Sequence, residues 1–200
     1  MRLSFLVLLL CFLGFGRAGY TVVTLDPFSS RVDFTYDHYN HVSEHTTGSY
    51  TILGGLRHES LESVSLSSPS AYLSVFSGHG FLRAETSQNA TGTLTLTYPV
   101  GNKSPLDFEL NGDSEFRVDI TSDETAVPLT ISVMSSGGLT CSSKQNIPPD
   151  AGHRYYSENF CCFDTDQCDF SKVVSVAFSF DLPPLSNIEI LPIKINAITD

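Results

Sequence analysis

The sequence contains no tryptophan, and basic residues are scarce beside acidic ones. Its 200 residues include 11 Lys and Arg against 22 Asp and Glu, which gives a net charge of −11. A surface of this charge repels nucleic acids and anionic lipids, so we expect neither as a partner. The chain is nevertheless 41% hydrophobic, with 14 phenylalanines. That composition excludes disordered and collagen-like chains and predicts one globular domain.

Long apolar runs are also lacking, except at the amino terminus. Arg2 precedes an almost unbroken apolar stretch over residues 3–15, and Gly16 and Ala18 supply the small residues of a cleavage site. This arrangement predicts a signal peptide over residues 1–18 and a secreted, extracellular protein. The stretch is too short to cross a bilayer and no second one follows, so we expect no membrane span. The single domain then covers the rest of the chain, 19–200.

Amphipathic helical periodicity is hard to find after the signal, and apolar residues alternate with polar ones instead. Over 93–98, Leu94, Leu96 and Tyr98 share one face and threonines occupy the other. Such alternation marks half-buried strands of antiparallel sheets, and short spacings between turn residues favour a sandwich or barrel. We therefore predict an all-β, two-sheet, jelly-roll-like β-sandwich. The expected strands are 21–24, 31–36, 61–67, 71–76, 80–84, 93–98, 115–120, 129–133, 174–180 and a last one from 188.

The alternation slips once in the closing strand. Ile188 and Ile190 point to one face, but Ile193 and Ile195 fall on the opposite phase of the alternation, and Pro192 lies where the phase changes. Because proline cannot donate a ladder hydrogen bond, the slip predicts either a bulge or an edge position.

Cysteine pairs of the CxxC type, which would favour zinc, are absent. Cys11 leaves with the signal, so four cysteines remain in an oxidising compartment, where disulfides are expected. A bond between neighbours Cys161 and Cys162 would close a strained ring. Two pairings stay open: Cys141–Cys161 with Cys162–Cys168, or Cys141–Cys162 with Cys161–Cys168.

All four of these cysteines lie in the segment 138–171, which lacks alternation. We expect this segment to be a loop insert between core strands, stapled by its disulfides.

Several short segments follow one another in a familiar order: ILGGLR at 52–57, GTLTLTY at 92–98, FRVDI at 116–120, LTISV at 129–133 and DFSKV at 169–173. In this order they resemble secreted β-sandwich domains of bacterial exported proteins with PEP-type sorting tails. The resemblance runs from Tyr20 to Ile198 and implies a sandwich fold and an exported protein, but no particular chemistry. The sorting tail is missing here, and the cysteine-containing insert is not part of the family pattern.

Three carboxylates close together, Asp164, Asp166 and Asp169, provide hard oxygen ligands that suit calcium at extracellular concentrations. Asp150 or Glu158 could complete the shell if the insert folds back. The alternative is a solvated acidic loop without metal.

Three histidines form an H-x2-H-x3-H cluster: His38, His41 and His45. With Asp37 or Glu44 they could bind a metal ion. On an extended segment, however, His38 and His41 would point to opposite faces, which favours a polar loop rich in histidine.

Tyrosines in polar surroundings can stack on sugar rings, and Tyr36, Tyr39, Tyr155 and Tyr156 are the candidates for glycan binding. Asn89 begins an Asn-Ala-Thr sequon and is the predicted glycosylation site.

Catalytic motifs are missing: there is no G-x-S-x-G elbow and no H-E-x-x-H. We therefore expect a non-catalytic matrix or cell-surface protein that binds extracellular glycan, mineral or matrix proteins, with calcium as the cofactor. One alternative is a polysaccharide hydrolase with two carboxylates among Glu44, Glu62, Glu109 and Asp119. A second is a self-assembling structural protein whose open edge is the closing strand near Pro192.

Overall fold

The computed structural model describes residues 19–39, 41–99, 114–123, 125–159, 163 and 173–199, with the side chains of 19–21, 63, 150–159 and 197–199 left out. The expected signal peptide, the acidic residues Asp164, Asp166 and Asp169, and Cys161, Cys162 and Cys168 lie outside the described residues. Within them, no helix is long and apolar enough to cross a membrane.

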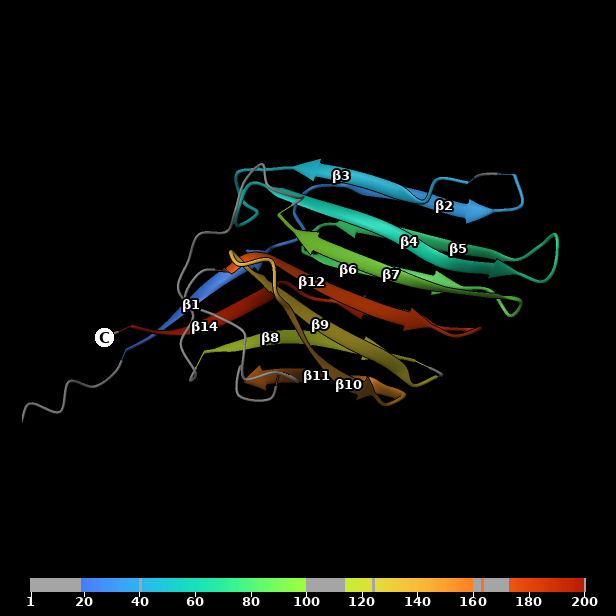
Figure 1. The fold of residues 1–200 in the computed structure, drawn as a ribbon. Coiled ribbons are helices and arrows are strands. Elements are labelled where there is room, and N and C mark those ends of the chain that lie inside the picture. Colours follow the sequence, from blue (N-terminus) through green and yellow to red (C-terminus); the bar gives the residue numbers. More distant parts are fainter. Residues whose placement is uncertain are drawn as a thin grey trace, which may run out of the picture.

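Two antiparallel sheets pack face to face, which confirms the predicted all-β sandwich (Figure 1). Sheet A has the order β1 (Gly19–Asp26), β14 (Ile193–Thr199), β8 (Glu115–Ser122), β13 (Asn187–Ile190), β6 (Phe81–Thr86), β5 (Tyr72–Gly78) and β2 (Val32–Asp37). β11 (Asp150–Asn159) pairs with the other edge of β8. Sheet B has the order β10 (Thr140–Ile147), β9 (Val127–Ser135), β12 (Val173–Leu182), β7 (Ala90–Tyr98), β4 (Leu56–Leu66) and β3 (Glu44–Gly48).

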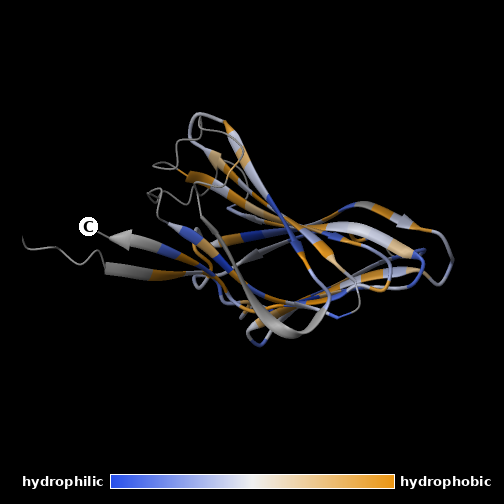
Figure 2. Cartoon of the chain, turned by 90° about the horizontal axis from the view of Figure 1, so that it is seen from below, coloured by the Kyte–Doolittle hydropathy of each residue, from blue (hydrophilic) through white to orange (hydrophobic). Residues whose placement is uncertain are grey.

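The core lies between the sheets because alternate residues of each strand point inward. In β7 every second residue is buried, including Leu94, Leu96 and Tyr98, while the threonines between them are half-buried on the outer face. Figure 2 shows the alternation of hydrophobic and hydrophilic positions along the strands. Phe116 of sheet A meets Phe178 of sheet B edge-to-face, with ring centroids 5.6 Å apart. Such aromatic contacts across the interior fix how the sheets pack.

The slip at Pro192 is a bulge. Both β13 and β14 pair with the same edge of β8, with Ile190 opposite Ile120 and Ile195 opposite Phe116. The closing strands thus use one residue more than β8 over this distance, which is the definition of a bulge. The alternative of an edge position was wrong, because β13 lies between β6 and β8, and β14 between β1 and β8. The closing strand is therefore not the open edge that self-assembly was expected to use.

The segment 138–171 contributes two strands rather than loop alone, β10 beside β9 and β11 beside β8. β10 escaped detection because its inward positions include Cys141 and Ser143, which do not read as an apolar alternation. Cys141 is disulfide-bonded. It is the one cysteine among the described residues, so both predicted pairings stay predictions.

Candidate functional site

The segment that carries the strongest sequence resemblance, residues 52–57, forms the turn into β4. Gly54 and Gly55 have φ values of 79° and 80°, in the left-handed region that favours glycine. The amide of Gly55 donates to Ile52 O at 2.8 Å, which closes the turn. The chain therefore enters β4 with Arg57 directed into the sandwich, where its side chain is 0% exposed.

Arg57 is the centre of a polar cluster inside the core. Its Nη1 lies 2.6 Å from Asp26 Oδ2, and its Nη2 donates to Ser77 Oγ at 2.8 Å. Its Nε lies 2.9 Å from Glu59 Oε1, and its Cζ sits 5.2 Å from the centroid of the Phe28 ring. Since Asp26 and Ser77 belong to sheet A and Arg57 to sheet B, this one side chain joins the two sheets.

Tyr98 completes the cluster from β7, because its hydroxyl donates to Asp26 Oδ2 at 3.0 Å. Burial raises the pKa of Tyr98, so the hydroxyl stays protonated and keeps that hydrogen bond. Asp26 also accepts the amide of Phe28 at 2.7 Å. Each of these contacts is internal to the fold, and we assign the cluster to stability rather than to a ligand.

Glu59 is the perturbed acid of this cluster. Burial raises its pKa from 4.5 to about 7, Arg57 opposes the rise and Asp26 adds to it. Its side chain is 0% exposed, and His45 Nδ1 lies 3.7 Å from Oε2 at the solvent edge. A carboxylic acid with such a pKa can act as a catalytic proton donor. Glu59 does not line any of the four grooves found among the described residues.

A second set of side chains lies on the outer face of sheet A, where β5 and β6 form a hairpin. Their two-residue connection, His79 and Gly80, has φ values of 56° and 93°, as a type I′ turn requires at both central positions. The turn sets a register in which Gly78 faces Phe81. Phe76 and Phe81 are consequently diagonal neighbours on the outer face, with ring centroids 5.6 Å apart and planes at 44°.

These two rings form part of a groove of about 300 Å³. Both rings are partly exposed. The outer face of a sheet in a sandwich normally carries polar side chains instead. The groove is lined by Asp33, Ser74, Val75, Phe76, Phe81, Arg83 and Glu85.

Charged groups surround the aromatic pair. Arg83 Cζ lies 6.0 Å from the Phe81 ring centroid, its Nη2 donates to Glu189 at 2.9 Å and its Nη1 is 3.8 Å from Glu85. The register places Asp33, Phe76 and Arg83 in one row across β2, β5 and β6. The groove therefore combines two tilted aromatic rings with hydrogen-bond acceptors and a planar donor.

The tyrosines expected to bind glycan lie at two edges of sheet A. Tyr36, in β2, packs edge-on against His41 with centroids 5.3 Å apart, and Tyr39 is 85% exposed in the following turn. Tyr155 and Tyr156 lie in β11, at the opposite edge beyond β8, and their side chains are outside the described residues. The structure does not bring the two pairs together, and their role stays a prediction.

The three histidines do not form a metal site among the residues that the structure describes, where no group of His, Cys, Asp and Glu could hold an ion. His38 contacts Tyr39, His41 contacts Tyr36, and His45 stacks on Phe34. The predicted polar loop rich in histidine describes His38 and His41, but His45 lies in β3, where it faces Glu59 of β4. Calcium at Asp164, Asp166 and Asp169 stays a prediction.

Asn89 is exposed in the turn before β7, where a glycan would have room, and the glycosylation stays a prediction.

The described carboxylates that the hydrolase hypothesis named are divided between the two sheets. Glu44 and Glu62 are exposed on sheet B, whereas Asp119 is buried in sheet A. Glu109 lies outside the described residues.

Sequence reasoning missed Phe76 and Phe81, although a signal was present. In β5 and β6 the inward positions are Leu73, Val75 and Leu82, so the phenylalanines fall on the outer face of each strand. Two phenylalanines at outward positions of adjacent strands are the signal that the sequence offered.

Comparisons with known proteins find only distant structural similarities. No model of a known protein family matches, and no curated protein is similar in sequence. An agarase, AgWH50C, has 12% identity and a TM-score of 0.49 over 70% of this chain, which spans 24% of the agarase. A family 29 carbohydrate-binding module complexed with mannohexaose has 13% identity and a TM-score of 0.44, covering 90% of this chain and 92% of the module. The family 11 module of Lic26A-Cel5E from Clostridium thermocellum has 12% identity and a TM-score of 0.42, covering 86% and 98%. These similarities are too distant to indicate a ligand for this chain.

Proposed function

We propose that the protein is a non-catalytic carbohydrate-binding β-sandwich whose ligand site is the groove on the outer face of sheet A. One observation carries the proposal: Phe76 and Phe81 are partly exposed, 5.6 Å apart, and flanked by Asp33, Arg83 and Glu85 in one groove.

The chemistry of a sugar ring matches this groove. A pyranose has a C–H face that stacks on aromatic rings and hydroxyl groups that donate to carboxylates or accept from a guanidinium. The side chains of Asp33 and Glu85 are 60% and 38% exposed, so their oxygens are accessible beside the rings. The groove has more acidic than basic groups, and the chain carries a net charge of −11, which favours neutral over anionic polysaccharides.

We further propose that the protein acts outside the cell. The amino-terminal apolar segment supports export, and the disulfide-bonded Cys141 fits an oxidising compartment. Calcium binding by Asp164, Asp166 and Asp169, and binding of mineral or matrix proteins, stay predictions.

Affinity gel electrophoresis tests the sugar site, with mixed-linkage glucan, glucomannan, xylan and agarose as neutral probes and alginate as the anionic one. We expect at least one neutral polysaccharide to retard the protein, and Phe76→Ala to weaken that binding roughly tenfold or more, about 1.4 kcal/mol. Tyr50→Ala is the matched control, because Tyr50 is 99% exposed and lies outside the groove.

Circular dichroism confirms that each variant is folded. Retardation by no polysaccharide, or unchanged binding by a folded Phe76→Ala variant, would overturn the proposed site. Release of reducing ends from any probe would show instead that the protein is a hydrolase. Repeating the gels with calcium and then with EDTA separates a calcium requirement from the sugar site itself.

A further inference from the structure

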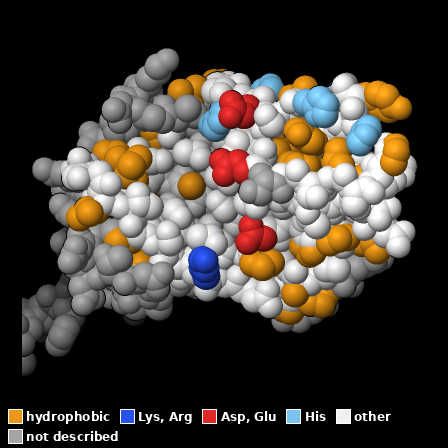
Figure 3. Space-filling model, turned by 45° about the vertical axis from the view of Figure 1, so that its right-hand side comes forward, with side chains coloured by type: hydrophobic (Ala, Val, Ile, Leu, Met, Phe, Trp, Pro, Cys, Tyr) orange, Lys and Arg blue, Asp and Glu red, His pale blue; other side chains and the backbone are white. Residues whose placement is uncertain are grey.

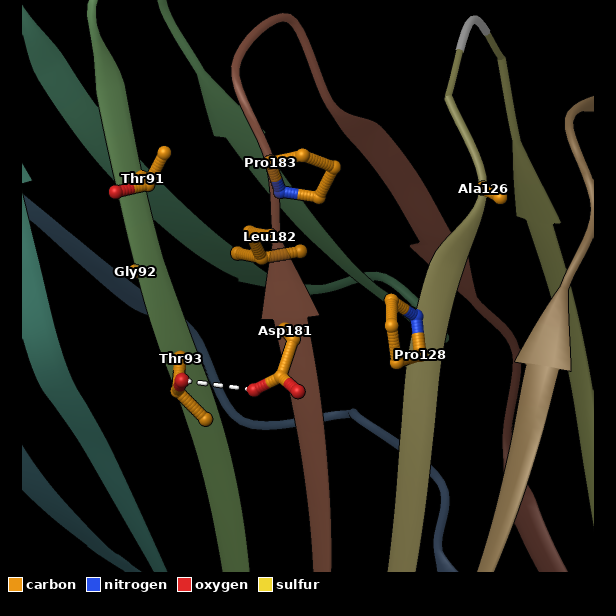
Figure 4. Close-up of a pocket in the computed structure, with 8 residues that line it drawn as sticks. All are labelled: Thr91, Gly92, Thr93, Ala126, Pro128, Asp181, Leu182 and Pro183. Atoms are coloured by element: carbon orange, nitrogen blue, oxygen red, sulfur yellow. Dashed lines mark hydrogen bonds between the residues drawn. The ribbon is translucent and has the colours of Figure 1, made fainter.

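A groove of about 420 Å³ lies on the outer face of sheet B, on the opposite side of the sandwich from Phe76. Figure 4 shows its lining residues, which come from β7, β12, β9 and the segments that flank them. In β12, Asp181 faces Thr93 of β7, and the preceding residue, Phe180, faces Leu129 of β9. Asp181 therefore lies opposite Pro128 on its other side. Thr93, Asp181 and Pro128 thus form one row across the three strands.

The lining offers one charge and several apolar surfaces. The Thr93 hydroxyl donates to Asp181 Oδ1 at 2.9 Å, and Figure 4 shows the second carboxylate oxygen turned away from Thr93, toward β9. That exposed oxygen can accept hydrogen bonds from a ligand. Pro128, on the neighbouring strand, and Pro183, two residues further along the chain, add rigid aliphatic rings beside Asp181. A carboxylate acceptor next to two apolar rings suits a neutral sugar ring, which has both a C–H face and hydroxyl donors.

The hydroxyl surface continues beyond the groove along the same face. Thr95 and Ser179 form a hydrogen-bonded pair at 3.0 Å, and Ser132 and Ser142 form another at 2.8 Å. With strands about 4.8 Å apart, the six strands of sheet B span roughly 24 Å. Figure 3 shows few charged side chains, with histidines along its upper edge and hydrophobic patches among the polar side chains. The surface is therefore weakly charged, which suits a neutral polymer.

We propose that this groove is a second polysaccharide site, and that the two sites on opposite outer faces allow one molecule to bridge two neutral polysaccharide chains. The inference rests on the proposed function of the groove at Phe76. The two outer faces of a β-sandwich point away from each other, so the ligands cannot compete for space.

Light scattering from mixtures of the protein with soluble glucomannan and with mixed-linkage glucan measures bridging, and gel retardation measures binding. The wild type is expected to form large complexes at intermediate ratios of protein to polysaccharide. Asp181→Ala and Phe76→Ala are each expected to lower the scattering at least tenfold. Asp181→Ala is still retarded through the groove at Phe76, whereas Phe76→Ala keeps only the weaker retardation that the groove at Asp181 gives. Glu44→Ala is the matched control, because it removes an exposed carboxylate from the same sheet outside the groove.

The outcomes separate the two proposals. A wild type that is retarded but scatters no more than the polysaccharide alone overturns the second site and leaves the first standing. Full scattering by Asp181→Ala also overturns it, because bridging would then come from association of the protein with itself. A wild type that no polysaccharide retards contradicts the proposed function as well.

Discussion

Replacing Glu59 by Gln tests how the buried cluster depends on pH. The side chain is 0% exposed, and the pKa is raised by burial to about 7 from an ordinary 4.5. The positive charge of Arg57 offsets the cost of ionising Glu59 only in part, because Arg57 Nη1 is also paired with Asp26 Oδ2 at 2.6 Å. Glutamine has nearly the same shape and cannot ionise, so it reproduces the protonated acid.

The direction of the effect follows from proton linkage. Between pH 4.5 and about 7 the folded chain keeps a proton on Glu59 that the unfolded chain has released. The stability contributed by this group is therefore complete below pH 4.5, falls as the pH rises through this window, and is lost above about 7. At about 1.4 kcal/mol for each pH unit, the loss is on the order of 3 kcal/mol.

Urea unfolding followed by far-ultraviolet circular dichroism, from pH 4 to pH 8, measures the effect. The free energy of unfolding of Glu59→Gln minus that of the wild type is expected to start near zero and rise by about 3 kcal/mol across the window. The titrations of other groups cancel in this difference of unfolding free energies, because the wild type and the variant share those groups. His45, which lies 3.7 Å from the carboxylate, is tested separately as His45→Gln in both backgrounds. A difference that stays flat, or that falls with pH, would refute the reasoning, since Arg57 would then hold Glu59 ionised.

Two further changes probe the packing and the turn. Phe178→Ala removes a 0% exposed ring that contacts Phe116 across the two sheets, and the same urea assay is expected to show a loss of about 3–5 kcal/mol. Its neighbour change Ser179→Ala, on the outer face, should cost less than about 1 kcal/mol, and equal losses would contradict the assignment of the core. Gly55→Ala, at φ 80°, is expected to cost roughly 1–2 kcal/mol through backbone strain alone, because nothing lies within 4 Å of the added methyl group. Gly137→Ala, where φ is not in the left-handed region, is its control, and no difference in melting temperature between the two variants would contradict a strained turn.

Much of the sandwich could be read from the sequence because apolar alternation is a local signal. It located the strand of Leu94 and Leu96 and the slip at Pro192, although it left open whether that slip is a bulge or an edge. It missed β10, whose buried positions include a cysteine and a serine, and β3, whose residues are mostly polar and exposed. Strands at the edges of a sheet bury less surface and therefore carry a weaker pattern.

The buried cluster and the grooves depend on contacts between distant residues. Arg57 looks like a surface residue in the sequence, and only the pairing of β4 with β7 and the packing against β1 place it among Asp26, Glu59 and Tyr98. Likewise, Asp181 and Thr93 are 88 positions apart and meet only when β12 pairs with β7. Their outward direction was predictable, but which residues stand beside them was not.

The pairing of Gly19 with Thr199 determines how the domain responds to mechanical force. β1 and β14 are antiparallel, so these two residues lie side by side at one end of the molecule, as Figure 1 shows for the two strands. A pull applied through both ends opens the ladder one hydrogen-bonded pair at a time, because the bonds run perpendicular to the strands and are loaded in turn. The ladder between β1 and β14 would thus yield by peeling at low force, starting at Gly19 and Thr199.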